Sequence, residues 1–268
     1  MQITSARNPR VLALAELRSR RGRDRAGLML VEGYDELRTA LQSGARPTAL
    51  YYSPSLVRDA SQLSMVERIR ELGAEVFELS PRVFEKVAYR QSADGWLAEV
   101  PAIATGLERL QPPERPLLLV SAGVEKPGNL GAMLRTAEAA GVDAVIASPP
   151  GTDWGNPNVV RASRGSLFAV AVAEAEQAEL VRWLREREVS IAVADPESGM
   201  AYTSADLRGG VAIVVGAESE GLQASWKDVA DVSLRVPMFG WMNSLNVSTS
   251  AALLIYEALR QRGRLASD

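Results

Sequence analysis

Residues 117–141, LLLVSAGVEKPGNLGAMLRTAEAAG, contain the pattern that decides the fold: a buried strand, a turn and an amphipathic helix. The run 117–122 is apolar nearly throughout, as in parallel strands that helices cover on both faces. A Pro-Gly turn follows, and then apolar side chains recur at the spacing of one helix face, at Leu130, Met133, Leu134 and Ala137. The segment predicts a strand-turn-helix unit whose helix lies near 129–140.

The rest of the second half continues this alternation. Further apolar runs are expected as strands at 144–148, 167–172, 190–194, 211–216 and 232–237. Amphipathic helices fit near 176–188 and in the segment 241–259. We therefore expect an α/β fold with a mainly parallel sheet flanked by helices.

The first half reads as a smaller α/β domain. Short β-like runs at 28–31, 48–52, 75–79 and 96–100 alternate with helix-like segments near 9–20, 34–43 and 62–72. The proline-rich stretch 101–116, PAIATGLERLQPPERP, is typical of a linker. The expected division is a domain at 1–100, a linker at 101–116 and a domain at 117–268.

Composition narrows the chemistry. The 268 residues are 47% hydrophobic and 24% charged, which is ordinary for a soluble globular protein, and no apolar run approaches the roughly 18 residues of a membrane helix. We expect a cytoplasmic protein without a membrane segment.

The chain has no Cys and no His, which excludes thiolate nucleophiles, Cys-ligated zinc and Ser/His/Asp hydrolases, and we expect no metal. Chemistry must use carboxylates, hydroxyls, amides, Lys, Arg or the substrate itself.

The basic residues are unevenly placed. The net charge is -3, yet residues 1–25 hold seven arginines against two acidic residues. Arginine makes bidentate contacts with phosphate, so this cluster fits an RNA backbone, although a solvated helix face is the alternative.

Three stretches place polar side chains next to predicted strand and helix ends. In the helix near 129–140, Asn129 is either a cap or a ligand contact, and Arg135 is turned about 140° from the centre of the apolar stripe. In VAIVVGAESEGL, 211–222, Gly216 and Glu218 follow a buried strand, where open α/β sheets bind ligands, although a plain structural turn is the alternative.

The third stretch precedes the last helix. Asn243, Ser244, Asn246 and Ser248 crowd its expected start. One capping residue explains one such side chain, and several together also suit a polar ligand beside a helix N-terminus. Capping and ligand binding stay open on the residues alone.

Taken together, the segments NLGAMLRTAEAAG, VVGAESEGL and VPMFGWMNSLNVSTSAALLIYE resemble the three signature motifs of the SpoU (TrmH-like) RNA 2'-O-ribose methyltransferases of the SPOUT superfamily. The intermediate NPNVVRASRGSLF is similar to that family as well. The N-terminal ITSARNPRV and LVEGYDEL resemble the ribosomal-protein-like (L30e-like) RNA-binding domain of members that act on rRNA. The stretch QSADGWLAEV departs from that domain's usual sequence, which leaves the RNA target less defined.

The resemblance implies a SPOUT α/β-knot, a deep trefoil knot that holds S-adenosylmethionine, in a homodimer. It implies 2'-O-methylation of a ribose in structured RNA, with 23S rRNA favoured over tRNA as the substrate. The alternatives are a tRNA 2'-O-methyltransferase and a non-catalytic RNA-binding protein that retains the knotted fold.

The resemblance also assigns site residues. Catalytic roles fall to Arg135, Asn129, Glu218, Ser244 and Asn246. Cofactor contacts fall to Val215, Gly216, Ala217, Val236, Met238, Ser244 and Leu245. RNA contacts are expected at Arg7, Arg10, Arg21, Arg23 and Arg161.

Proton removal from the ribose hydroxyl is assigned in the family to the arginine at position 135, assisted by an RNA phosphate. A guanidinium has a pKa above about 12 and is a poor base. The second possibility is that Arg135 clamps the phosphate and orients the hydroxyl while the proton leaves late.

Overall fold

The computed structural model describes residues 2–90, 92–149, 151, 153–217 and 221–265, and the chain divides into two compact units. The first unit comprises residues 1–103 and 153–169, and the second comprises 104–152 and 170–268. The segment 153–169 thus belongs with the N-terminal unit, although its sequence position lies inside the expected second domain. Its helix packs on the first unit through the buried Val159 and Val160.

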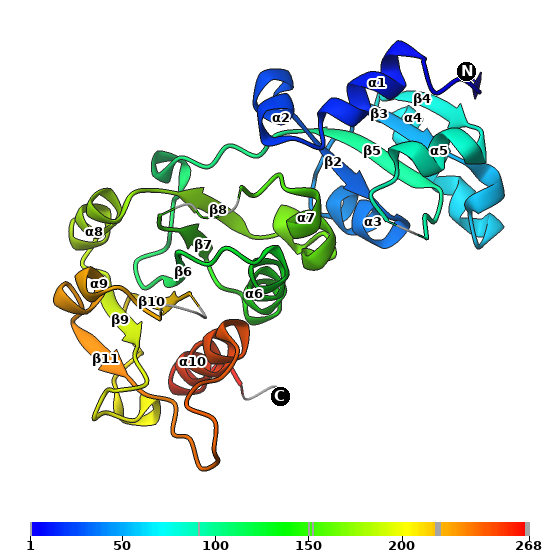
Figure 1. Ribbon diagram of the computed structural model, residues 1–268. Helices are drawn as coiled ribbons and strands as arrows, with labels where there is room; N and C mark the ends of the chain where they lie inside the picture. Colours follow the sequence, from blue (N-terminus) through cyan, green and yellow to red (C-terminus); the bar gives the residue numbers. More distant parts are fainter. Residues whose placement is uncertain (1, 91, 150, 152, 218–220, 266–268) are drawn as a thin grey trace. The chain divides into compact units, whose positions relative to one another are not determined.

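The first unit is a mixed sheet with helices around it (Figure 1). Its strands are β1 (Gln2–Ile3), β2 (Leu28–Glu32), β3 (Ala49–Tyr52), β4 (Glu75–Leu79) and β5 (Trp96–Pro101). Its α-helices are α1 (Pro9–Glu16), α2 (Arg20–Ala26), α3 (Tyr34–Gln42), α4 (Ser64–Glu71), α5 (Pro81–Val87) and α7 (Pro157–Ser163). Short 3-10 turns are η1 (Pro54–Leu56), η2 (Ala60–Leu63) and η4 (Ser166–Phe168).

The strand order of this sheet is β1-β4-β3-β5-β2, in which β5 runs antiparallel to both of its neighbours. One side of the sheet packs against α1 and α5 through buried side chains that include Leu14, Phe77 and Phe84.

The second unit is built on a six-stranded, fully parallel sheet of order β11-β9-β10-β6-β7-β8. Its strands are β6 (Leu117–Ala122), β7 (Ala144–Ala147), β8 (Ala171–Glu174), β9 (Ser190–Ala194), β10 (Val211–Gly216) and β11 (Val232–Leu234). Its α-helices are α6 (Pro127–Ala140), α8 (Gln177–Arg185), α9 (Ala224–Asp228) and α10 (Val247–Gln261), with 3-10 turns η3 (Leu107–Arg109) and η5 (Tyr202–Ser204).

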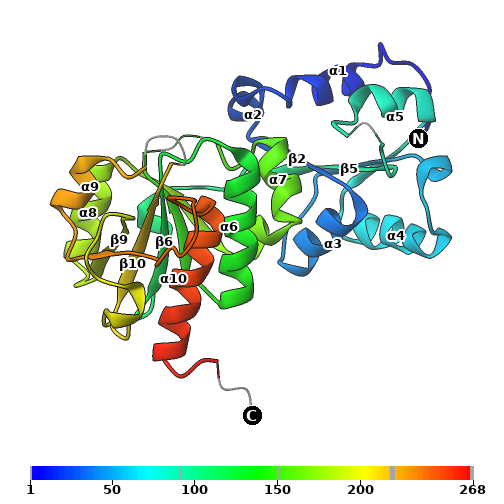
Figure 2. The same cartoon turned by 60° about the horizontal axis from the view of Figure 1, so that its bottom comes forward.

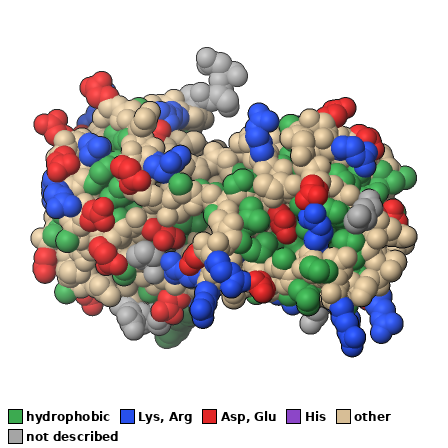
Figure 3. Space-filling view, turned by 90° about the horizontal axis from the view of Figure 1, so that it is seen from above, with side chains coloured by type: hydrophobic (Ala, Val, Ile, Leu, Met, Phe, Trp, Pro, Cys, Tyr) green, Lys and Arg blue, Asp and Glu red, His purple; other side chains and the backbone are tan. Residues whose placement is uncertain are grey.

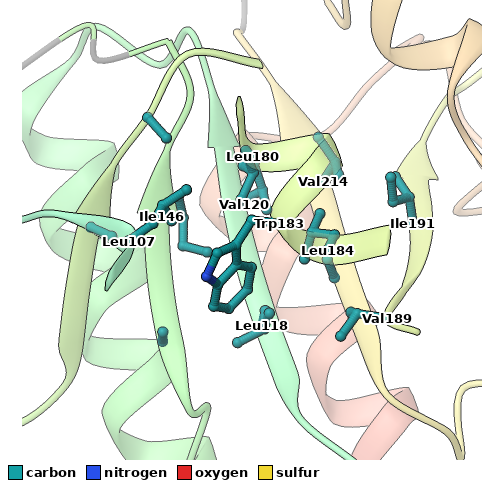
Figure 4. Close-up of a cluster of buried hydrophobic side chains, with 14 of the residues drawn as sticks. Leu107, Leu118, Val120, Ile146, Leu180, Trp183, Leu184, Val189, Ile191 and Val214 are labelled. Carbon is teal, nitrogen blue, oxygen red and sulfur yellow. The ribbon is translucent and has the colours of Figure 1, made fainter. Parts of the chain in front are cut away.

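Alternation along the strands gives this sheet two covered faces. Leu118 and Val120 of β6 point to one face, where they pack with Leu180, Trp183 and other buried side chains (Figure 4). The opposite face is covered by α6 and α10, which lie side by side (Figure 2) and contact the central strands. Burial on both faces explains why the strands read as continuous apolar runs.

The expected α/β architecture with a parallel sheet is confirmed, and two details of the expectation are wrong. The run 167–172 is not one strand, because Gly165 has a φ of 88° and starts the turn η4, so that β8 begins only at Ala171. The helix expected near 9–20 ends at Glu16, because the hydroxyl of Ser19 accepts a hydrogen bond from the Gly22 amide at 3.1 Å and starts α2.

Among the described helices, none has the length and apolar character that a membrane crossing needs.

Candidate active site

A cavity of the second unit lies at the carboxyl end of β9, and its lining includes residues that follow β10 and β11. Gly216 at the end of β10 pairs in register with Ala122 of β6, and the end of β9 lies beside β10. The cavity has a volume of about 760 Å³, and its walls come from three segments: 194–197, 221–227 and 235–244. Open α/β sheets bind ligands at this edge, because the strand ends leave backbone groups and loops there.

A glycine is required at position 216 because the backbone of Gly221 and Leu222 lies close to its Cα. A Cβ at this position would lie 2.5 Å from the carbonyl carbon of Gly221 and 2.6 Å from the amide nitrogen of Leu222. The return of the chain is fixed by a hydrogen bond of 2.9 Å from the Gly221 amide to the Ala217 carbonyl. Of the cofactor contacts expected here, Val215 has its side chain in the core, so only its backbone is available to a ligand. Glu218 lies outside the described residues.

The loop between β11 and α10 forms the opposite wall and extends away from the body of the unit as the orange segment of Figure 1. The expected contacts Val236, Met238 and Ser244 line the cavity, whereas Leu245 does not and is partly exposed. Three of these four loop residues thus face the cavity, and Leu245 faces solvent.

Two amide side chains join the starts of α6 and α10. Asn246 is the N-cap of α10, and its Oδ1 accepts a hydrogen bond of 2.9 Å from the Ser248 amide. Its Nδ2 lies 3.2 Å from Oδ1 of Asn129 in the first turn of α6. The structure thus confirms capping by Asn246, and ligand binding by this residue stays a prediction.

Replacing Asn246 with serine should separate these two roles. Serine is an equally good N-cap, so the free energy of unfolding in urea should change by less than about 0.5 kcal/mol. Its shorter side chain cannot reach Asn129, and we expect the single-turnover rate of the reaction that the three motifs imply to fall by about tenfold or more. Asn246→Ala is the control for the cap and should cost about 1 kcal/mol of stability. A serine variant with the wild-type rate would show that the amide pair is purely structural.

Arg135 lies apart from the amide pair within this chain. It is on the exposed face of α6, six residues and about 9 Å along the axis from Asn129. It does not line the cavity, and no hydrogen bond or ion pair joins it to another residue in the described ranges. The structure thus brings Asn129 and Asn246 together and leaves the Arg135 guanidinium exposed to solvent.

The cavity also contains an ion pair that the sequence reasoning missed. Asp195 follows β9, and its Oδ2 lies 2.9 Å from Nζ of Lys227 in α9. Burial opposes the charged form of Asp195, but the hydrogen bonds from Lys227 and the Glu197 amide prevail and lower the pKa of Asp195. Asp195 also raises the pKa of Lys227 by hydrogen bonding. Its position after a buried parallel strand was the signal that would have found it.

The arginines expected to contact RNA lie in the first unit and differ in availability. Arg7, Arg21 and Arg161 are exposed. Arg10 pairs with Glu75 at 2.8 Å, and its guanidinium lies 4.2 Å from the centre of the Phe77 ring.

The Arg23 side chain is buried in the first unit. Only 4% of it is exposed, and its Nη2 pairs with Asp153 at 2.8 Å while Nη1 donates to the carbonyls of Leu17 and Arg18 at 2.9 Å. A buried guanidinium with these partners holds the segment 153–169 on the unit, so we leave Arg23 out of the RNA surface proposed below.

A parallel α/β sheet with a cavity at its carboxyl edge, walled by a glycine turn and an amide-rich loop, defines a ligand-binding α/β protein of the nucleotide-binding kind. The profile described as SpoU rRNA Methylase family matches residues 116–256, and that of the MRM3-like substrate binding domain matches residues 8–98. The chain belongs to the SpoU rRNA methylase family, which confirms the resemblance seen in its three motifs.

Relatives match over most of their length. The 23S rRNA (guanosine-2'-O-)-methyltransferase RlmB of Bordetella pertussis is 32% identical over 242 residues, which cover 88% of this chain and 99% of that protein. The 23S rRNA (uridine(2479)-2'-O)-methyltransferase of Streptomyces viridochromogenes is 29% identical and covers 94% of this chain and 90% of its own length.

A solved structure matches the entire chain. The crystal structure of an AdoMet-bound rRNA methyltransferase from Sinorhizobium meliloti has a TM-score of 0.88 and 26% identity, and covers 100% of this chain and 99% of that one.

Proposed function

We propose that this protein transfers the methyl group of S-adenosylmethionine to a ribose 2'-hydroxyl of RNA, with 23S rRNA as the substrate. The observation that carries the proposal is the cavity at the carboxyl edge of the parallel sheet, with the Asn129–Asn246 pair at the start of the two helices beside that edge. Family membership and the names of the relatives support the same reaction.

The residues of the cavity fit the cofactor. Its volume of about 760 Å³ suits a ligand of nucleoside size, and Gly221 and Leu222, whose backbone lies close against Gly216, are part of its lining. Of the expected contacts, Val236, Met238 and Ser244 line the cavity and would hold it. Backbone groups of Val215, Gly216 and Ala217 are proposed as further contacts, whereas Leu245 does not line the cavity. When bound, S-adenosylmethionine supplies an electrophilic methyl group on a sulfonium.

The chain itself contributes positioning. Asn129, Asn246 and Ser244 have amide and hydroxyl groups that suit orientation of a ribose hydroxyl, and holding two reactants in line removes much of the entropic barrier. Glu218 belongs to the same proposed set. We assign to Arg135 the clamping of an RNA phosphate and the orientation of the hydroxyl, because a guanidinium is a poor base and contacts phosphate through two donors.

A direct test is the mapping of 2'-O-methyl groups in RNA from cells with and without the gene. Loss of one methyl in 23S rRNA, restored by the purified protein with S-adenosylmethionine, is the expected result. Loss of a 2'-O-methyl group in tRNA alone would identify tRNA as the substrate. Cofactor binding by the protein without loss of any methyl group in the cells would favour the non-catalytic alternative. A substrate in ribosomal RNA would place the protein in the cytoplasm.

The RNA surface of the first unit is proposed to include Arg7, Arg10, Arg21 and Arg161. Basic and acidic side chains are interspersed on the face shown in Figure 3. Arg10 is included because an exposed ion pair such as Arg10–Glu75 stabilises little and is easily exchanged for a phosphate.

The combined variant Arg7→Ser, Arg21→Ser should bind an rRNA fragment about tenfold or more weakly at low salt, with a reduced slope of affinity against salt concentration, because phosphate contacts release counterions. Arg208→Ser is a matched control, since Arg208 is an exposed arginine of the second unit that pairs with Asp206. Filter binding over a salt series measures the effect. An unchanged salt slope in the double variant would contradict the proposed surface.

We also propose that two copies form a homodimer and that the second unit contains the trefoil knot of the family. Support for the dimer comes from the loop before α10, where Phe239 and Trp241 are fully exposed and Met242 is 72% exposed. Apolar side chains grouped in this way are costly to leave in water and mark interaction surfaces.

The combined variant Phe239→Ser, Trp241→Ser should shift sedimentation from dimer towards monomer across a dilution series, because it removes the largest exposed apolar groups of this loop. Leu12→Ser is the control, since Leu12 is 54% exposed but lies in the first unit. A double variant that sediments like the wild type would place the interface elsewhere.

A further inference from the structure

Asp195 is a charged side chain inside the cavity that none of the roles above uses. It is 9% exposed and is held from three sides. Its Oδ1 accepts a hydrogen bond of 3.1 Å from the Glu197 amide, and its Oδ2 lies 2.9 Å from Lys227 Nζ and 3.5 Å from Ser233 Oγ. The carboxylate therefore has a fixed orientation before any ligand enters.

The bonding of Asp195 leaves room for one more donor. A carboxylate oxygen can accept two hydrogen bonds, and within the described residues Oδ1 accepts only the one from Glu197. Lys227 neutralises the charge of the carboxylate at close range. The open position on Oδ1 suits a hydroxyl donor, which adds a hydrogen bond without a further charge.

The sheet order fixes which part of a ligand reaches Asp195. β9, which leads into Asp195, is two strands from β6, which leads into α6 and Asn129. Neighbouring strands are about 4.8 Å apart, so the two ends of this edge are roughly 10 Å apart. If the Asn129–Asn246 pair held the methyl group, a ligand that spans this edge would bring its nucleoside end towards β9.

We propose that Asp195 is a binding residue for the adenosine portion of the cofactor and accepts a hydrogen bond from a ribose hydroxyl, with Lys227 as its positioning partner. This inference rests on the proposed function, since it names a subsite of the same cavity. It assigns to the segment after β9 the recognition of the cofactor sugar, apart from the residues that act on the RNA ribose.

The test compares S-adenosylhomocysteine with its 2'-deoxy and 3'-deoxy adenosyl analogues by calorimetry on the full-length protein. The wild type should bind one of the deoxy analogues about tenfold more weakly. Asp195→Ala should bind S-adenosylhomocysteine about tenfold more weakly and should no longer distinguish it from that analogue. In turnover assays the same variant should raise KM for the cofactor more than it lowers kcat.

Asp206→Ala is the matched control, because Asp206 is an exposed aspartate of the second unit that pairs with Arg208 at 2.9 Å and does not line the cavity. It should keep the wild-type discrimination. Asp195→Asn preserves the packing and replaces Asp195→Ala if the latter fails to fold, with a smaller loss of discrimination expected.

Three results would overturn the inference. In the first, the wild type binds S-adenosylhomocysteine and both deoxy analogues equally. In the second, Asp195→Ala loses affinity but still discriminates, as expected if Asp195 held the ammonium of the amino-acid portion. In the third, the variant binds like the wild type. Each leaves the proposed function intact, whereas a wild type that binds no S-adenosylhomocysteine would remove both.

Discussion

Arg135→Ala is expected to reduce methyl transfer to RNA by about 10²-fold or more and to leave the affinity for S-adenosylhomocysteine within about twofold of the wild type. The rate and the affinity should respond differently because of where Arg135 lies. Arg135 is exposed on α6 and does not line the cavity, so its loss leaves the cofactor walls unchanged. A guanidinium that orients the reacting hydroxyl and its phosphate acts in the transition state, where the loss of one preorganised charged donor costs on the order of 10²–10³ in rate.

Two further variants sharpen this experiment. Arg135→Lys keeps the charge but loses the planar fork, and its rate should fall between those of the wild type and the alanine variant. Glu138→Ala changes another exposed residue of α6 and should leave both rate and affinity unchanged. Calorimetry for the cofactor and single-turnover assays on RNA give the two readouts. Equal loss of binding and activity in Arg135→Ala would refute the assignment.

Gly216→Ala should abolish cofactor binding, with a loss of affinity of about 100-fold or more. The added Cβ would collide with backbone atoms of Gly221 and Leu222, and these atoms cannot move aside easily because the Gly221 amide is hydrogen-bonded to Ala217. The strand end must then separate from the returning chain, which deforms the cavity lining at Gly221 and Leu222 and should cost about 1–3 kcal/mol of stability.

Gly240→Ala is the matched control for this substitution. Gly240 lines the cavity, and a Cβ there meets no atom within 4 Å. The affinity of Gly240→Ala for S-adenosylhomocysteine should stay within about threefold of the wild type. Thermal unfolding with and without S-adenosylhomocysteine distinguishes loss of the site from loss of the fold, and a Gly216→Ala variant with a full ligand-induced shift would contradict the proposed role of Gly216.

The sequence determined the type and order of most elements in the second unit. Continuous apolar runs such as 117–122 and 211–216 favour strands covered on both faces, and the helical spacing of Leu130 to Ala137 indicates one buried face. The three motifs also identified the family, because they combine residue types that fold alone does not require. Local periodicity indicates the type of each element and the motifs indicate the family, and both can be read without the tertiary structure.

Only the tertiary structure decided which distant residues meet. Asn129 and Asn246 are 117 positions apart and are joined because α6 and α10 cover the same face of the sheet. Asp195 reaches Lys227 because β9 lies between β10 and β11, and Arg23 is buried because Asp153 returns to the first unit. Periodicity specifies which side of an element is buried, but not the strand order that sets its neighbours, since that order follows from packing the entire chain.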